Sequence, residues 1–195
     1  MVPRGATCAV LILLALACSK KQDDQEEKHR RAPEVMGTNW DGEPFKLSQT
    51  YGKVTALVFG YTFCPDVCPF TLARMRQMYA ELGDDADQAA VVFVSVDPER
   101  DTVEKLSQYV PAFDKRFYGV NVKGDALHAA VHAYDLRVRK GQSLGDPEAK
   151  DQYAVDHTGT IFLIGKDGRI HYEHPHDASV DTLLKDVRSL LEEGT

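Results

Sequence analysis

The residues of this sequence best suited to chemistry are two cysteines, Cys64 and Cys68, with three residues between them. The apolar run at 54–59 before them predicts a buried strand, and the segment 69–82 after them predicts a helix. Thiols at a helix N-terminus are favoured as thiolates by the helix dipole and by its free N–H groups. A thiolate in this turn can attack a disulfide or bind a soft metal ion.

The spacing of the pair leaves both chemistries open. Thioredoxin-type redox motifs have two residues between the cysteines, and the longer loop here still permits a disulfide, which needs a Cα separation of about 4.4–6.8 Å. The same loop lets both sulfurs face one ion. Two thiolates suit Cu(I) well and Zn(II) acceptably.

Length, charge and cysteine count narrow the class of protein. A chain of 195 residues predicts one domain with appendages, and a net charge of −7 with no basic face argues against a nucleic-acid partner. Two of the four cysteines, Cys8 and Cys18, lie in the leading segment. The predicted domain therefore holds only the Cys64/Cys68 pair, which is no structural disulfide framework.

The first 32 residues have the layout of an exported and tethered segment. Residues 1–17 carry Arg4 and then an apolar run, which predicts a secretory signal too short for the roughly 20 residues of a membrane-spanning helix. Residues 15–18 (ALAC) resemble a bacterial lipobox with Ala15 where leucine is usual, so we expect Cys18 to be lipidated. An ordinary signal cut near Ala17 and an uncleaved anchor are the alternatives. Residues 18–32 are polar and charged, which predicts a flexible tether ahead of a domain at 33–195.

The sequence of the domain predicts an alternation of strands and helices. Asp101 and Glu104 are spaced as a capping box for a helix to about 109, and Asp125 can cap another to about 134. Residues 140–151 are a polar loop. The remaining expected elements are strands near 35–36 and 44–47, a core strand at 90–96, a short strand at 136–139, a hairpin at 160–164 and 169–172, and an amphipathic helix at 180–191.

This order, with thiols after the first core strand, predicts an α/β thioredoxin-like domain. Its central mixed sheet is flanked by helices and carries an N-terminal strand extension and an inserted segment. In such folds the loop that leads into the strand at 160–164 passes beside the cysteines, so His157 is the best third ligand. Two thiolates and one imidazole make a three-coordinate site that favours Cu(I). Asp156, the neighbour of His157, is expected to point away from the thiols.

Most other side chains that could bind a metal are interpreted as surface, core or turn residues. His128 and His132 are four residues apart on a predicted helix and are expected at its surface, while Met75 and Met78 are expected in the core. Asp66, between the thiols, is interpreted as a turn residue. The remaining candidate is a pair of histidines that could form a secondary copper spot, His174 and His176.

Three sequence blocks together resemble the Sco/SenC family: residues 61–69 (YTFCPDVCP), 95–102 (SVDPERDT) and 155–158 (VDHT). Their order and spacing cover about residues 33–192. The resemblance implies a membrane-anchored copper-binding protein that faces the periplasm and helps assemble the dinuclear copper site in subunit II of cytochrome c oxidase. It also implies that Cys64, Cys68 and His157 are the metal ligands. Family members usually have a transmembrane anchor, and this chain departs from them in its lipobox-like segment.

Three functions remain to be distinguished. The preferred hypothesis is a monomeric metallochaperone that carries copper, as Cu(I) with Cu(II) left open, and needs no turnover chemistry. Other periplasmic copper chaperones are further expected partners, and the sequence leaves the copper donor open. The second is a thiol–disulfide oxidoreductase in which Cys64 and Cys68 are the redox pair. The third is a peroxidase on the same fold, although Thr62 lies two residues before Cys64 where peroxiredoxins have threonine three before.

Overall fold

The structure is a computed structural model that describes residues 29–141 and 153–193. The predicted signal, Cys18, the tether as far as residue 28 and most of the predicted polar loop lie outside the described residues. One compact unit comprises Ala32–Thr195. Among the helices that are described, none has both the length and the apolar character needed to cross a membrane.

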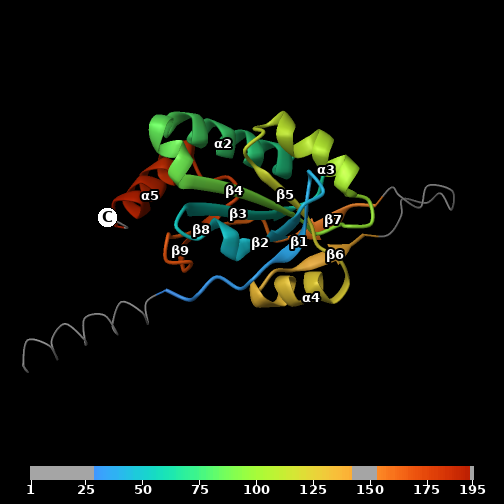
Figure 1. The fold of residues 1–195 in the computed structure, drawn as a ribbon. Helices are drawn as coiled ribbons and strands as arrows, with labels where there is room; N and C mark the ends of the chain where they lie inside the picture. Colours follow the sequence, from blue (N-terminus) through green and yellow to red (C-terminus); the bar gives the residue numbers. More distant parts are fainter. Residues whose placement is uncertain (1–28, 142–152, 194–195) are drawn as a thin grey trace, which may run out of the picture. The chain divides into compact units, whose positions relative to one another are not determined.

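Two fully buried strands form the centre of the main sheet. All seven residues of β3 (Val54–Gly60) and of β4 (Ala89–Ser95) are buried, because these near-continuous apolar runs are covered on both faces as parallel strands are. The sheet runs β2-β1-β5-β4-β3-β8-β9, with β3, β4 and β5 parallel and the other neighbours antiparallel (Figure 1). The other strands are β1 (Met36–Asn39), β2 (Pro44–Lys46), β5 (Tyr118–Asn121), β8 (Thr160–Ile164) and β9 (Ile170–Pro175). The predicted central mixed sheet is therefore confirmed.

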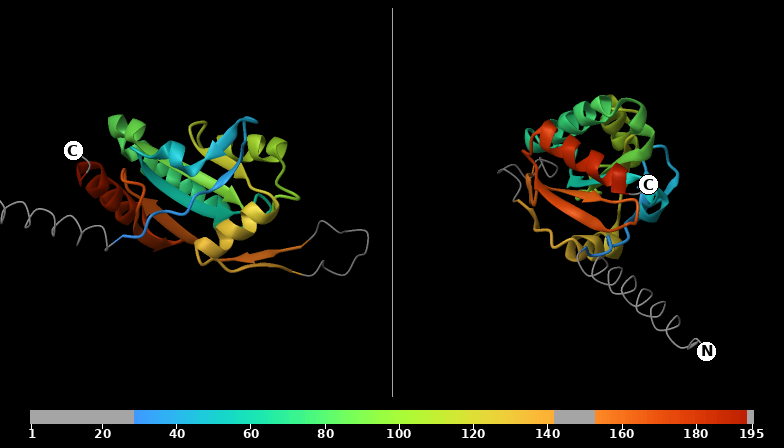
Figure 2. Two further views of the ribbon diagram at one scale, coloured as in Figure 1. Left: turned by 60° about the horizontal axis from the view of Figure 1, so that its bottom comes forward. Right: turned by 90° about the vertical axis from the view of Figure 1, so that its left-hand side faces the viewer.

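Helices cover both faces of this sheet. Helix α2 (Val67–Glu81) packs against α5 (Val180–Glu193) on one face, and α4 (Gly124–Ala133) covers the opposite face (Figures 1 and 2). Five leucine and valine side chains of α5 are buried, and burying each contributes about 1.5–3 kcal/mol. Within residues 29–141 and 153–193, the remaining helices are α3 (Val103–Tyr109) and three short 3₁₀ turns, η1 (Leu47–Thr50), η2 (Gly83–Gln88) and η3 (Val110–Ala112).

Three predicted helix starts are wrong. Helix α2 begins at Val67 rather than 69, because Pro69 fits within a first turn whose N–H groups have no intrahelical partner. The N-cap of α3 is Thr102, whose hydroxyl accepts a hydrogen bond from the Lys105 amide at 3.3 Å, so Asp101 does not form the expected capping box. Helix α4 begins at Gly124, ahead of the expected cap at Asp125.

Two strands were not predicted. Strand β5 is short and contains Gly119, where a Cβ atom would come within 2.6 Å of the Val110 side chain, so packing rather than propensity requires the glycine. The other is β7 (Val155–His157), which pairs antiparallel with β6 (Val138–Lys140) in a separate two-stranded sheet. Strand β6 itself begins two residues later than expected. Because β7 leads into β8 after two residues, it carries His157 to the edge of the main sheet.

Candidate functional site

The candidate site lies where the parallel strands β3 and β4 end. Gly60 and Ser95 are register partners at their carboxyl ends, so the segments that follow the two strands leave the sheet side by side. A Cβ atom at position 60 would lie 2.8 Å from the Cys68 sulfur and 2.7 Å from the Phe93 ring. Glycine at this position therefore allows the thiol to sit against the end of β3.

The two cysteines differ in exposure and in acidity. Cys68 is 4% exposed and Cys64 is half-buried, and both are free thiols. The Cys68 amide donates to the Cys64 sulfur at 3.4 Å. Hydrogen bonding from the Cys68 thiol lowers the pKa of Cys64 to about 5, whereas the same bond and burial raise the pKa of Cys68. The pair thus shares one proton over a wide pH range, with the negative charge on Cys64.

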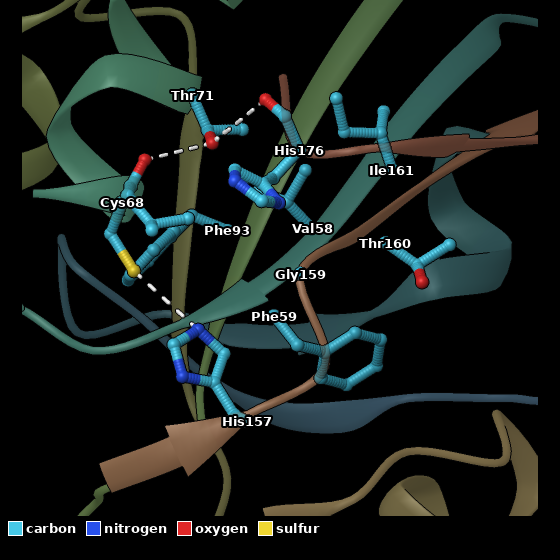
Figure 3. Close-up of a pocket in the computed structure, with 11 residues that line it drawn as sticks. Val58, Phe59, Cys68, Thr71, Phe93, His157, Gly159, Thr160, Ile161 and His176 are labelled. Atoms are coloured by element: carbon cyan, nitrogen blue, oxygen red, sulfur yellow. Dashed lines mark hydrogen bonds between the residues drawn. The ribbon is translucent and has the colours of Figure 1, made fainter. Parts of the chain in front are cut away.

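His157 directs a ring nitrogen at the buried thiol. Its Nε2 lies 3.6 Å from the Cys68 sulfur (Figure 3). Its Nδ1 lies 3.0 Å from the Val155 carbonyl oxygen, which can only accept, so Nδ1 carries the proton and Nε2 presents its lone pair to the sulfur. The Tyr61 ring meets the imidazole edge to face at 5.5 Å. A backbone carbonyl that sets the tautomer in this way also orients histidines that ligate metals.

A buried carboxylate holds the cysteine segment to β4. Asp101 is fully buried and accepts hydrogen bonds from the Thr62 amide at 3.0 Å, the Thr62 hydroxyl at 2.6 Å and the Ser95 hydroxyl at 2.7 Å. Burial raises the pKa of Asp101 even though these bonds lower it. Thr62 is two residues before Cys64, so Asp101 fixes the backbone that carries the half-buried thiol.

A second buried carboxylate holds the histidine segment. Asp97, fully buried, accepts from the Tyr153 hydroxyl at 2.6 Å and forms an ion pair with Arg100. The Arg100 guanidinium donates to the Tyr153 carbonyl at 2.9 Å and stacks 3.6 Å from the centroid of the Tyr153 ring. Tyr153 is four residues before His157. Residues 97–101, which follow β4, thus tie both halves of the site to one strand.

A small hollow of about 10 Å³ lies beside the buried thiol (Figure 3). Three metal-binding side chains line it, Cys68, His157 and His176, while the rest of the wall is largely apolar. An apolar wall excludes water from the sulfur and favours a soft ion of low charge over a hard hydrated one.

The structure brings some of the predicted site residues together and leaves others apart. Cys64, Cys68 and His157 meet at one edge of the sheet. Asp156 is exposed, and so is Asp66. The histidine pair on α4 is also exposed, and the two methionines of α2 are buried in the core: these are His128, His132, Met75 and Met78.

Sequence reasoning missed the supporting residues Asp97, Arg100 and Asp101. A signal was present, because all three follow a buried strand that is parallel to the one before the cysteines, and carboxyl ends of neighbouring parallel strands meet at one edge. Their partners could not be read from the sequence. The sequence analysis assigned Asp101 a capping role within its own helix, whereas the structure shows contacts of Asp101 with residues of other segments.

The types of side chain at the site fit a soft metal ion, although these side chains do not converge on one point in this structure. Across residues 29–141 and 153–193, no group of three or more histidine, cysteine, aspartate and glutamate side chains is arranged to hold an ion. Cys68 and His157 already face each other, so an ion between them needs only the approach of the half-buried Cys64. Two sulfurs and one imidazole suit Cu(I) and Zn(II).

Comparisons with known proteins identify one family. The family model described as SCO1/SenC matches residues 23–192. The human mitochondrial SCO2 homolog is 33% identical over 70% of this chain and 51% of its own length, so the chain spans about half of that relative.

Two solved structures extend the likeness to the fold. The apo Sco1 protein of Thermus thermophilus is 34% identical with a TM-score of 0.73, covering 83% of this chain and 92% of its own. ScoI of Bradyrhizobium japonicum with copper bound is 29% identical with a TM-score of 0.72, covering 82% and 99%. The main sheet with thiols after its first central strand, and a family match over most of the sequence, place this chain in the SCO1/SenC family.

Proposed function

We propose that this protein is a copper metallochaperone that carries the ion on Cys64, Cys68 and His157 to the dinuclear site in subunit II of cytochrome c oxidase. The observation that carries the proposal is the 3.6 Å approach of an imidazole lone pair to the Cys68 sulfur. The copper-bound ScoI of Bradyrhizobium japonicum supports copper as the cargo.

The acidities of the pair set the order of loading. Cys64, with a pKa of about 5, is a thiolate at neutral pH and can take the ion first, from solvent or from another copper chaperone. Cys68 still holds its proton and loses it when the ion displaces it. His157 is already oriented by its contact with the Val155 carbonyl, so its Nε2 faces the buried sulfur before the ion arrives. Loading therefore releases the Cys68 proton.

Unloading follows the same path in reverse. Cys64 is the more exposed ligand, so an acceptor's thiolate can replace it first, while Cys68 and His157 still hold the ion. Stepwise exchange between three-coordinate species never frees the ion into water. Transfer to a particular acceptor then depends on that acceptor's higher affinity.

An anaerobic Cu(I) titration tests the proposal. The reduced protein should bind one Cu(I), and X-ray absorption should report two sulfurs and one nitrogen. His157→Ala should lose the nitrogen and about tenfold or more of the affinity, and Cys64→Ser and Cys68→Ser should lose more. His128→Ala, on the exposed face of α4, is the matched control. Unchanged Cu(I) affinity in His157→Ala, together with intact disulfide reduction, would overturn the chaperone proposal.

The low pKa of Cys64 favours a second candidate, a thiol–disulfide oxidoreductase. The Cys64 thiolate attacks one sulfur of a target disulfide and displaces the other as a thiolate. Cys68 then gives up its proton and attacks the Cys64 sulfur, which releases the second target thiolate. The two electrons come from the dithiol pair, which ends as a disulfide. In this function His157→Ala keeps full activity.

We also propose that the chain is lipidated at Cys18 and holds its domain at the periplasmic face of a membrane. Support comes from the ALAC segment at 15–18 and from the apolar run before it. Incorporation of labelled palmitate in the producing cells should occur in the wild type and stop in Cys18→Ser. Continued labelling of that variant would refute the anchor.

A further inference from the structure

The two histidines at the end of β9 have different environments. His174 lies 3.0 Å from the Asp186 carboxylate of α5 and stacks on Tyr172, with ring centroids 5.9 Å apart. His176, just beyond the strand, lines the same hollow as Cys68 and His157 (Figure 3). The two histidines expected to form a secondary copper site are therefore in different places, and of the two His176 lines the hollow beside the thiol.

The backbone of His176 is attached to the helix that carries Cys68. Its carbonyl oxygen accepts from the Arg74 guanidinium of α2 at 3.3 Å. The same oxygen lies 3.4 Å from the hydroxyl of Thr71, also on α2, whose proton goes to the nearer Val67 carbonyl at 2.9 Å. The segment that carries this imidazole is thus tied to the helix that carries the buried thiol.

The ring of His176 lies over the backbone that follows His157. A Cβ atom at Gly159 would come within 3.1 Å of the His176 Cβ and 3.2 Å of its Cγ and Nδ1. A side chain at that position would require the ring to shift by a few tenths of an ångström. Glycine therefore leaves the room in which a second imidazole can approach the site from the side of β8.

The imidazole of His176 has no competing role within the described residues. There, its ring takes part in no hydrogen bond or ion pair, unlike His157 with Val155 and His174 with Asp186. The residue is half-buried, so its ring is neither fully exposed to solvent nor fully packed in the core. A side-chain rotation can turn a nitrogen toward an ion held by Cys68.

We propose that His176 is an accessory copper ligand, which joins Cys64, Cys68 and His157 when the ion is Cu(II). Cu(I) is satisfied by the two sulfurs and one imidazole of the proposed function, on which this inference rests. Cu(II) prefers four ligands in a tetragonal arrangement with nitrogen donors. A second imidazole supplies the missing ligand and lets one pocket accept either oxidation state. The binding step involves loss of the Cys68 proton and no electron transfer.

Pulsed electron paramagnetic resonance of the Cu(II)-loaded full chain tests the proposal, because remote imidazole nitrogens modulate the echo and can be counted. We expect two imidazoles in the wild type, one in His176→Asn, and two in the matched control His174→Asn. Competition titration should show Cu(II) affinity lowered at least about tenfold in His176→Asn, with Cu(I) affinity changed less than about threefold. His176→Ala, with its circular dichroism unchanged, should recover the second nitrogen signal when free imidazole is added.

The outcomes separate this inference from the proposed function. One imidazole in the wild type, or no loss in His176→Asn, overturns the accessory ligand while Cu(I) binding through His157 still supports the carrier. Failure of the wild type to bind Cu(I) overturns the carrier and the accessory ligand with it.

Discussion

The acidity of Cys64 gives the most demanding test of the site, through the variant Cys68→Ala. The largest cause of the lowered Cys64 pKa is the hydrogen bond from the Cys68 thiol, and burial opposes it. Alanine removes the donor and leaves the burial. We therefore expect the pKa of Cys64 to rise from about 5 toward the ordinary value of 9.0. Cys68→Ser keeps a hydroxyl donor and should retain part of the lowering.

The magnitude follows from two opposed effects on alkylation by iodoacetamide. Near pH 6, a thiol with a pKa of about 5 is about 90% ionised, and one with a pKa of 9.0 is about 0.1% ionised. Thiolate nucleophilicity falls by about 0.4–0.5 log unit for each unit of lowered pKa. Across about four units the second effect cancels about two decades of the first. Wild-type Cys64 should react only about 10–20-fold faster than an unperturbed thiol near pH 6.

The pH midpoint is therefore the more decisive observable. Alkylation is followed anaerobically from about pH 4 to 10, with peptide mass spectrometry that separates Cys64 from the other cysteines. We expect a wild-type midpoint near 5 and a clearly higher one in Cys68→Ala. A wild-type midpoint above about 8, or the same midpoint in both proteins, would refute the shared proton and the loading order built on it.

Three further predictions concern stability. Asp101→Asn replaces an oxygen that accepts hydrogen bonds from Thr62 and Ser95 with an amide donor. Urea unfolding should therefore show that the free energy of unfolding falls by about 1–3 kcal/mol. An unchanged unfolding midpoint would contradict the tethering role. Gly60→Ala places a methyl group 2.8 Å from the Cys68 sulfur; we expect a similar loss together with weaker Cu(I) binding, and full retention of both would be inconsistent with the close approach. In the reduced wild type, the contribution of Cys64 to the free energy of unfolding should rise between about pH 5 and 9. Over this range the Cys64 thiol of the native protein has released its proton, while that of the unfolded chain still holds it. The contribution should disappear as the pH falls through about 5. The difference from Cys64→Ala over this range measures that contribution, and a flat difference would oppose the prediction.

Much of the fold was predictable because its strongest signals are local. The apolar runs of β3 and β4, the hairpin of β8 and β9 and the stripe of α5 are each defined by residues within one segment. Weak signals failed: β5 is four residues long with a glycine, and β7 has three residues. Helix starts shifted by up to two residues because more than one nearby residue can serve as a cap or first-turn residue.

The thiol pair and His157 could be nominated from the sequence, but their chemistry depends on distant segments. The lone pair of His157 faces Cys68 because β7 pairs with β6 and presents the Val155 carbonyl to the other ring nitrogen. No pattern within a few residues contains that information.

By itself, the sequence determined where the longer strands and helices of the core run and which residue types could bind a soft ion, since both are properties of neighbouring residues. Only the tertiary structure decided that Asp101 holds the cysteine segment instead of capping a helix, and that His176 lines the hollow beside the thiol while His174 lies against Asp186. The physical reason is that buried polar groups take whichever partners the sheet order brings to them. That order is set by how the apolar faces of distant segments pack together.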